Sequence, residues 1–68
     1  DPALCLAVED SATGVTAAAR AGCPVIGFTG THHQPAAHAR RLRGAGAGMA
    51  FNAMAELPAL VSSFLRHA

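Results

Sequence analysis

The sequence predicts an α/β fold built on a parallel sheet, and three observations support this prediction. Two short apolar runs, residues 4–8 and 25–28, have the composition of strands that are buried on both faces. The segment between them repeats small and apolar residues at helical spacing, so the two strands are joined by one helix and run parallel. A strongly amphipathic helix is predicted near the end of the chain.

The first predicted helix follows the strand at residues 4–8 directly. Gly22 suits the position just after the C-terminus of this helix, and Pro24 introduces the second strand. The small and apolar residues of its inner face fall at i, i+3, i+4 and i+7: Val15, Ala18, Ala19 and Gly22. A right-handed crossover then places the end of the first strand at the carboxyl edge of the sheet, where open α/β sheets bind their ligands.

Three further elements are predicted after the polar loop at residues 29–35. Residues 36–43 form a short helix that a run of three glycines should end, at positions 44, 46 and 48. Residues 49–51 form a short third strand. The final helix has Pro58 in its first turn and carries one apolar face, made of Leu57, Leu60, Val61, Phe64 and Leu65.

Length and composition indicate a small core. The chain has 68 residues, enough for at most one small domain, and alanine accounts for about half of its 51% hydrophobic residues. Because burial contributes roughly 25 cal/mol per Å² of apolar surface, side chains this small stabilise a core little. We therefore expect residues 1–68 to form part of a larger domain.

Charge and cysteine usage exclude several classes of partner. The net charge is +1, and the one basic cluster, residues 40–43, lacks interleaved aromatic residues, so we expect no nucleic-acid partner. No apolar run is long enough to span a bilayer and Asp1-Pro2 does not resemble a signal peptide, so no membrane partner is expected. Cys5 and Cys23 form no CxxC motif, which favours buried free thiols and a reducing, cytoplasmic location.

Two of the four carboxylates of the chain, Glu9 and Asp10, stand side by side where the first strand meets the first helix. Mg²⁺ prefers oxygen ligands and is typically held by one or two carboxylates plus waters and a substrate phosphate. Acidic residues at a helix N-terminus also complement the helix dipole and cap free N–H groups. Since Ser11 is available as the cap, the pair is interpreted as a metal site, with capping as the alternative.

Other residues capable of chemistry form weaker patterns. Three histidines, His32, His33 and His38, have no cysteine or carboxylate near them in sequence, so we interpret them as exposed histidines rather than metal ligands. Ser11 lacks the flanking glycines of a nucleophile elbow, which favours helix capping. Gly14 stands alone where a dinucleotide-binding turn requires three glycines.

Residues 8–15, Val-Glu-Asp-Ser-Ala-Thr-Gly-Val, together with the second predicted strand, resemble the fourth motif of the haloacid dehalogenase-like hydrolase superfamily. The match is nearest to the sugar-phosphate phosphatase and phosphomutase branch, and residues 38–58 also resemble the ending of its bacterial members. The resemblance implies an α/β, Rossmann-like three-layer sandwich around a parallel sheet. Residues 1–68 would be its incomplete C-terminal part.

The resemblance also implies roles for individual residues. Asp10 would bind Mg²⁺ directly, Glu9 would bind it directly or through water, and Ser11 and Gly14 would shape the turn behind them. The metal would bridge to the phosphate of a small phosphorylated metabolite while a nucleophilic aspartate becomes an aspartyl-phosphate. The chain contains no Asp-x-Asp segment and no lysine, so the nucleophile, its acid/base partner and the usual phosphate-binding lysine would have to come from outside residues 1–68.

Two other classes remain as alternatives. A receiver-like Mg²⁺-binding signalling domain would need a further aspartate at the end of another strand, and none follows residues 25–28 or 49–51. A non-catalytic interaction fragment would use the acidic pair for capping alone. Because the central strand of the family's sheet is missing, we also expect one edge of the first strand to be unpaired and open to self-association.

Overall fold

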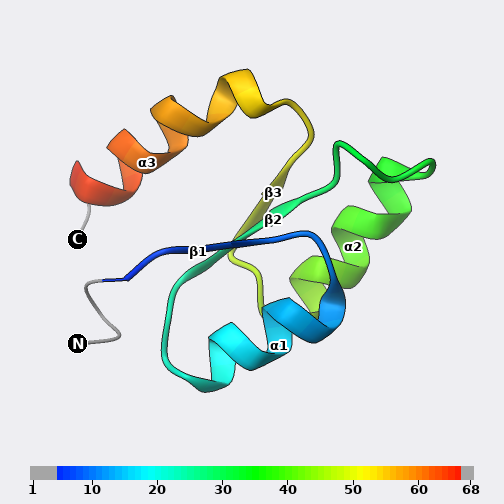
Figure 1. The fold of residues 1–68 in the computed structure, drawn as a ribbon, viewed down its shortest axis with the longest axis horizontal. Coiled ribbons are helices and arrows are strands. Elements are labelled where there is room, and N and C mark those ends of the chain that lie inside the picture. Colours follow the sequence, from blue (N-terminus) through cyan, green and yellow to red (C-terminus); the bar gives the residue numbers. More distant parts are fainter. Residues whose placement is uncertain (1–4, 67–68) are drawn as a thin grey trace.

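The computed structural model describes residues 5–66, which form an α/β fold with three strands and three helices (Figure 1). In chain order the elements are β1 (Ala7–Glu9), α1 (Ala12–Arg20), β2 (Val25–Phe28), α2 (Pro35–Ala45), β3 (Met49–Phe51), a 3₁₀ turn (Met54–Glu56) and α3 (Leu57–Arg66). The strands are parallel and lie in the order β1-β2-β3. The predicted fold class, a parallel α/β sheet with helices, is confirmed.

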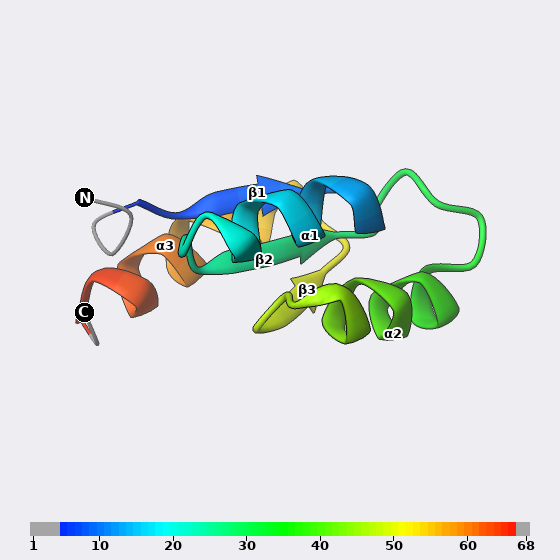
Figure 2. The same ribbon diagram turned by 90° about the horizontal axis from the view of Figure 1, so that it is seen from below.

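The helices form two outer layers around the sheet. Helices α1 and α2 pack on one face and α3 lies on the other, as Figures 1 and 2 show from two directions. The core lies under α1 and α2, where Val15 and Leu42 are fully buried against Val25 and Ala47. Alanines 7, 18, 19 and 45 pack around this cluster. Their small side chains let the two helices approach the sheet closely.

Two glycines with positive φ end the first two helices. Gly22 has a φ of 86° and follows α1 as predicted, in a conformation that side chains other than glycine's rarely adopt. Helix α2 is longer than predicted, because it continues through Gly44 to Ala45 and ends at Gly46, where φ is 127°. The Gly46 N–H donates to the Arg43 carbonyl at 3.1 Å and closes the last turn.

The first strand differs from the prediction for residues 4–8. Leu4 lies outside the described residues, and β1 begins at Ala7, whose N–H donates to the Pro24 carbonyl at 2.9 Å. Val8 is 37% exposed, so the expectation of a strand buried on both faces is wrong. The physical reason is that β1 forms an edge of the sheet, and side chains alternate between its faces, so Val8 lies opposite the face that α1 covers.

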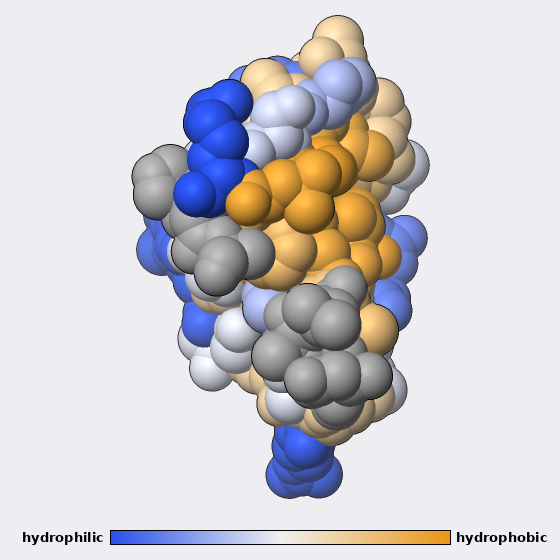
Figure 3. All heavy atoms as spheres, turned by 90° about the vertical axis from the view of Figure 1, so that its left-hand side faces the viewer, coloured by the Kyte–Doolittle hydropathy of each residue, from blue (hydrophilic) through white to orange (hydrophobic). Residues whose placement is uncertain are grey.

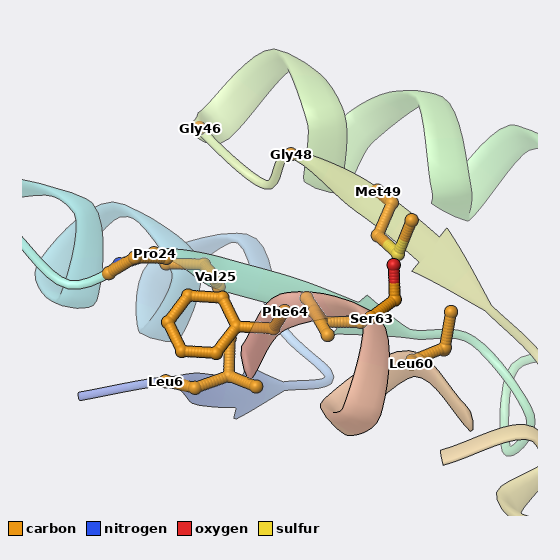
Figure 4. Close-up of a pocket in the computed structure, with 10 residues that line it drawn as sticks. Leu6, Pro24, Val25, Gly46, Gly48, Met49, Leu60, Ser63 and Phe64 are labelled. Carbon is orange, nitrogen blue, oxygen red and sulfur yellow. The ribbon is translucent and has the colours of Figure 1, made fainter. Parts of the chain in front are cut away.

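The face below α3 is incompletely covered. Helix α3 has no buried side chain: four of its five predicted apolar residues are half-buried, and the fifth, Leu65, is 67% exposed. A groove of about 380 Å³ separates Leu60 and Phe64 of α3 from Leu6 and Met49 on the sheet side (Figure 4). Apolar side chains gather at this end of the molecule (Figure 3). The three layers are present, but the second outer layer is thin.

The cysteines differ from the expected burial. Cys5 is exposed and Cys23 is only half-buried. Burial raises the pKa of the Cys23 thiol, and the neighbouring Cys5 thiol raises it further. None of the helices within residues 5–66 is long and apolar enough to cross a membrane.

Candidate functional site

The acidic pair lies at the carboxyl end of β1, where the chain turns into α1. Glu9 is the last residue of the strand and is half-buried, whereas Asp10 follows it and is exposed. Because the three strands are parallel, the loops after β2 and β3 emerge at the same edge of the sheet. The structure therefore places both carboxylates at the edge where the sequence positioned them.

Ser11 caps α1. Its backbone is extended, with φ −126° and ψ 150°, and its Oγ accepts a hydrogen bond from the Gly14 N–H at 3.0 Å. The Ser11 carbonyl accepts the first helical bond from Val15, also at 3.0 Å. The predicted capping role of Ser11 is confirmed, and the helix start does not depend on either carboxylate for a cap.

The side chain of Glu9 folds back over the start of α1. A Cβ atom built on Gly14 would overlap the Glu9 carboxylate and would lie 3.2 Å from Ser11 Oγ, so this position favours glycine. A carboxylate here faces the positive end of the helix dipole. The two interpretations of the pair, helix stabilisation and metal binding, therefore apply to different residues. Glu9 is placed to interact with the helix dipole, whereas Asp10 is exposed at the sheet edge, where a metal ion could reach it.

A contact that the sequence analysis missed joins α2 to this loop. His38 Nε2 lies 2.7 Å from the backbone carbonyl oxygen of Asp10, across 28 positions of sequence. The ring of His38 stacks on that of His32 at 4.2 Å between centroids, and His33 stacks on His32 at 4.7 Å. Only the His38–Arg41 spacing on one helix face could have indicated such a cluster.

The expectation of exposed histidines holds for His33 alone. His32 and His38 are half-buried, because α2 packs against α1 and presses His38 toward the Asp10 loop. Burial lowers the pKa of His32, and the nearby His38, His33 and Arg41 lower it further. The cluster therefore favours a neutral His32.

The donor set at the sheet edge matches part of a magnesium site. Within the described part of the chain, no group of three or more His, Cys, Asp or Glu side chains is placed to hold a metal ion. Asp10 offers an exposed carboxylate and Glu9 a second one that is turned toward α1, and Mg²⁺ usually takes only one or two carboxylates from a protein when waters and a substrate phosphate complete its shell. The chemistry of Glu9 and Asp10 therefore fits one part of a Mg²⁺ site, and we call these two residues the metal corner.

The residues that follow β2 and β3 add no carboxylate to this corner. Thr29 is buried and is committed to β3, since its N–H and its hydroxyl both donate to the Phe51 carbonyl, at 2.8 and 3.2 Å. Asn52 follows β3. A second acidic residue at a strand end, which a receiver-like site requires, is not found at either position.

Comparisons with known proteins give one informative match. No protein-family model matches the chain, and no curated protein does. Among solved structures, the chain is similar to a conserved haloacid dehalogenase-like protein of unknown function from Agrobacterium tumefaciens strain C58, with 41% identity and a TM-score of 0.79. The match covers 88% of this chain and 27% of that protein, so the chain spans about a quarter of the neighbour's length.

This match agrees with the geometry of the chain. An identity of 41% over most of the sequence is accompanied by the same fold, and that fold brings the Glu9-Asp10 pair to the carboxyl edge of a parallel sheet. The chain belongs to the haloacid dehalogenase-like superfamily.

Proposed function

We propose that residues 1–68 form the Mg²⁺-binding C-terminal part of a phosphatase that hydrolyses small phosphate monoesters, with sugar phosphates as the substrate class. The observation that carries this proposal is the exposed Asp10 carboxylate directly after a strand end, on a loop anchored at its backbone. The similarity to a haloacid dehalogenase-like protein supports the hydrolase class.

The residues of the corner would act in different ways. Asp10 would be the direct ligand, because its carboxylate is exposed at the carboxyl edge. Glu9 would bind through water or tune the charge of the corner, because its carboxylate is already turned toward α1. Ser11 and Gly14 would hold the turn that carries both. Bound Mg²⁺ would supply Lewis-acid and template chemistry toward a substrate phosphate.

A magnesium titration tests the metal role. Backbone amide spectra of the ¹⁵N-labelled chain should show shifts centred on residues 9–14 as Mg²⁺ is added, and Asp10→Asn should abolish them. Glu56→Gln is the matched control, because it removes an equal charge from an exposed residue after β3. Shifts that persist in Asp10→Asn, or that disappear equally in Glu56→Gln, would contradict a site at Asp10.

We also propose that the remainder of the catalytic domain covers the open face and the free edge of β1. The apolar groove between α3 and the sheet, the exposed Val8 and the thin second layer all suit contact with further polypeptide. The neighbouring structure contains more than three times the length of this chain. The nucleophilic aspartate and the phosphate-binding lysine would lie in that polypeptide.

The coding sequence upstream of Asp1 tests this extension. It should encode an apolar strand ending in Asp-x-Asp and, further along, a lysine. A reading frame without either would contradict the proposal. The isolated chain provides a second test: with the edge of β1 free, we expect it to self-associate on size-exclusion chromatography, whereas a monodisperse monomer would indicate a self-sufficient domain.

Activity of the isolated chain should be absent. Hydrolysis through an aspartyl-phosphate requires a nucleophile and a general acid within reach of one phosphorus atom, and the sequence offers only the metal corner. Turnover of a generic phosphate ester by the pure chain, abolished by a chelator, would contradict this division of roles.

A further inference from the structure

A cluster of three histidines and one arginine lies beside the Asp10 loop. His32 and His33 belong to the loop after β2, whereas His38 and Arg41 are one turn apart on α2. Arg41 Nη2 lies 3.2 Å from His38 Nδ1 and 3.2 Å from His32 Nε2. The contact of His38 with Asp10 connects this cluster to the proposed metal corner.

The hydrogen bond to Asp10 fixes the tautomer of His38. A backbone carbonyl can only accept, so His38 Nε2 must carry a hydrogen and donate it to the Asp10 oxygen at 2.7 Å. In the neutral ring Nδ1 then has a lone pair, and Arg41 donates to it. Both ring nitrogens of His38 are therefore engaged, and the orientation of the ring is set from two sides.

The partners of His32 direct Arg41 toward His38. The Gln34 N–H donates to His32 Nδ1 at 3.0 Å, so a neutral His32 carries its hydrogen on Nε2. Nε2 then has no lone pair for Arg41, and the 3.2 Å approach between them is a packing contact. Arg41 therefore donates its hydrogen bond to His38 Nδ1, and the ring of His38 also stacks on that of His32.

We propose that His38, oriented by Arg41, is a positioning residue that fixes the Asp10 peptide and so aims the Asp10 carboxylate. This inference rests on the proposed magnesium role of Asp10. The Ser11 cap holds the loop on its α1 side, and the His38 bond holds it at the preceding carbonyl. Mg²⁺ requires near-ideal octahedral geometry, so a ligand fixed at both ends of its loop loses less freedom on binding.

Because the Asp10 loop is exposed, loss of the His38 hydrogen bond should affect the orientation of Asp10 more than the stability of the fold. The Asp10 carbonyl lies at an exposed residue, so without His38 it can bond to water and is not left unsatisfied in the core. Loss of the His38 donor should thus change the free energy of unfolding little. Partners that orient metal ligands typically affect metal affinity by 10- to 100-fold, and we expect a loss of about 10-fold here.

Three variants of the full chain test the proposal. His38→Ala removes the donor. His38→Gln restores it, because the Gln amide nitrogen can donate to Asp10 while its oxygen accepts from Arg41. His33→Ala is the matched control, since His33 lies in the same cluster and contacts His32 only through its ring.

Two measurements on each variant report on the two parts of the proposal. Without metal, the carbonyl ¹³C shift of Asp10 and the amide shift of Ser11 should change in His38→Ala, return toward wild type in His38→Gln and stay constant in His33→Ala. The imidazole ¹⁵N shifts of wild-type His38 should show the Nε2–H tautomer. With Mg²⁺, His38→Ala should bind about 10-fold more weakly and His38→Gln should recover most of the affinity.

The outcomes distinguish the positioning role from the metal site. Equal Mg²⁺ affinity in wild type and His38→Ala, or an unchanged Asp10 carbonyl shift, would overturn the role of His38 and leave the magnesium site standing. Wild-type chain that shows the carbonyl and tautomer signatures but binds no Mg²⁺ would overturn the proposed function instead. A similar loss in His33→Ala would show that the effect comes from the cluster as a whole and would also overturn the specific role of His38.

Discussion

The two faces of the sheet differ in how completely this chain covers them. On one face α1 and α2 enclose a core in which Val15 and Leu42 are 0% exposed. On the other face α3 carries a more strongly apolar pattern than α1 or α2, yet its side chains are at best half-buried, and Leu65 is 67% exposed. An amphipathic pattern therefore predicts a helix and its apolar side, but burial depends on what lies opposite.

The difference extends to the loops at the carboxyl edge. The turn between β1 and α1 is held by the Ser11 cap and by the bond from His38, so the acidic pair belongs to the packed side of the molecule. The open side has instead a groove lined mostly by apolar side chains of α3 and the sheet side, among them Leu6, Met49 and Phe64. The proposed chemistry thus lies where the chain supplies its own supporting structure.

Core truncation should show the largest contrast between the faces. Leu42→Ala removes a fully buried side chain and should lower the free energy of unfolding by about 2–5 kcal/mol. Leu65→Ala, the same change on α3, should cost less than about 0.5 kcal/mol because the side chain is mostly exposed. Denaturant unfolding of both variants measures the contrast, and equal losses would contradict it.

Substitutions of the two acidic residues should affect different properties, Mg²⁺ affinity for Asp10 and the stability of α1 for Glu9. Asp10→Asn should weaken Mg²⁺ binding by more than about 10-fold, because it neutralises the exposed carboxylate that we propose as the direct ligand. Glu9→Gln should affect Mg²⁺ less and should instead destabilise α1 by about 0.3–1 kcal/mol, because its carboxylate faces the helix N-terminus. Calorimetric titration and thermal unfolding test the two effects, and the opposite ranking in Mg²⁺ affinity would reverse the assignment.

Loss of the helix cap should have a moderate effect confined to the packed side. Ser11→Ala removes the acceptor of the Gly14 N–H and should lower stability by about 1 kcal/mol. Ser62→Ala provides the control, since Ser62 is an exposed residue in the middle of α3. Thermal unfolding of the two variants should rank Ser11→Ala as clearly worse, and indistinguishable midpoints would argue against the capping role.

The smallest effect concerns pH and His32. The folded pKa of His32 lies below its ordinary value of 6.5, so above pH 6.5 both folded and unfolded states are neutral and its stabilisation is complete. As pH falls below 6.5 the unfolded chain binds the proton first, and stability decreases until the lowered folded pKa is passed. His32→Gln should flatten this part of the stability profile. An unchanged slope in His32→Gln would contradict the assignment.

Local patterns in the sequence were sufficient to predict most of the helices and strands of the fold. β2 has the predicted bounds, β3 the predicted residues, and Gly22 the predicted conformation, because strand composition and glycine backbone freedom act over a few residues. The start of β1 was misplaced because strand bounds depend on pairing, and the first bond is made at Pro24. Helix α2 continued past Gly44 because its last turn closes at Gly46.

The candidate site was only partly predictable. The acidic pair and the Ser11 cap are adjacent in sequence, so a motif and its spacing were enough to identify them. The separate orientations of Glu9 and Asp10 depend on the path of the chain at Gly14. The contact from His38 crosses 28 positions and depends on how α2 packs, which no local pattern specifies.

Native-state amide hydrogen exchange tests the contrast between the two faces most directly. Amides of β2, α1 and α2 should exchange slowly, near the limit set by global unfolding, because they lie around the buried core. Amides of α3 should exchange orders of magnitude faster, because a helix of 10 residues without a buried side chain is marginal in water. Protection of α3 equal to that of β2 in a monomeric chain would show that this face is complete, and would contradict the account.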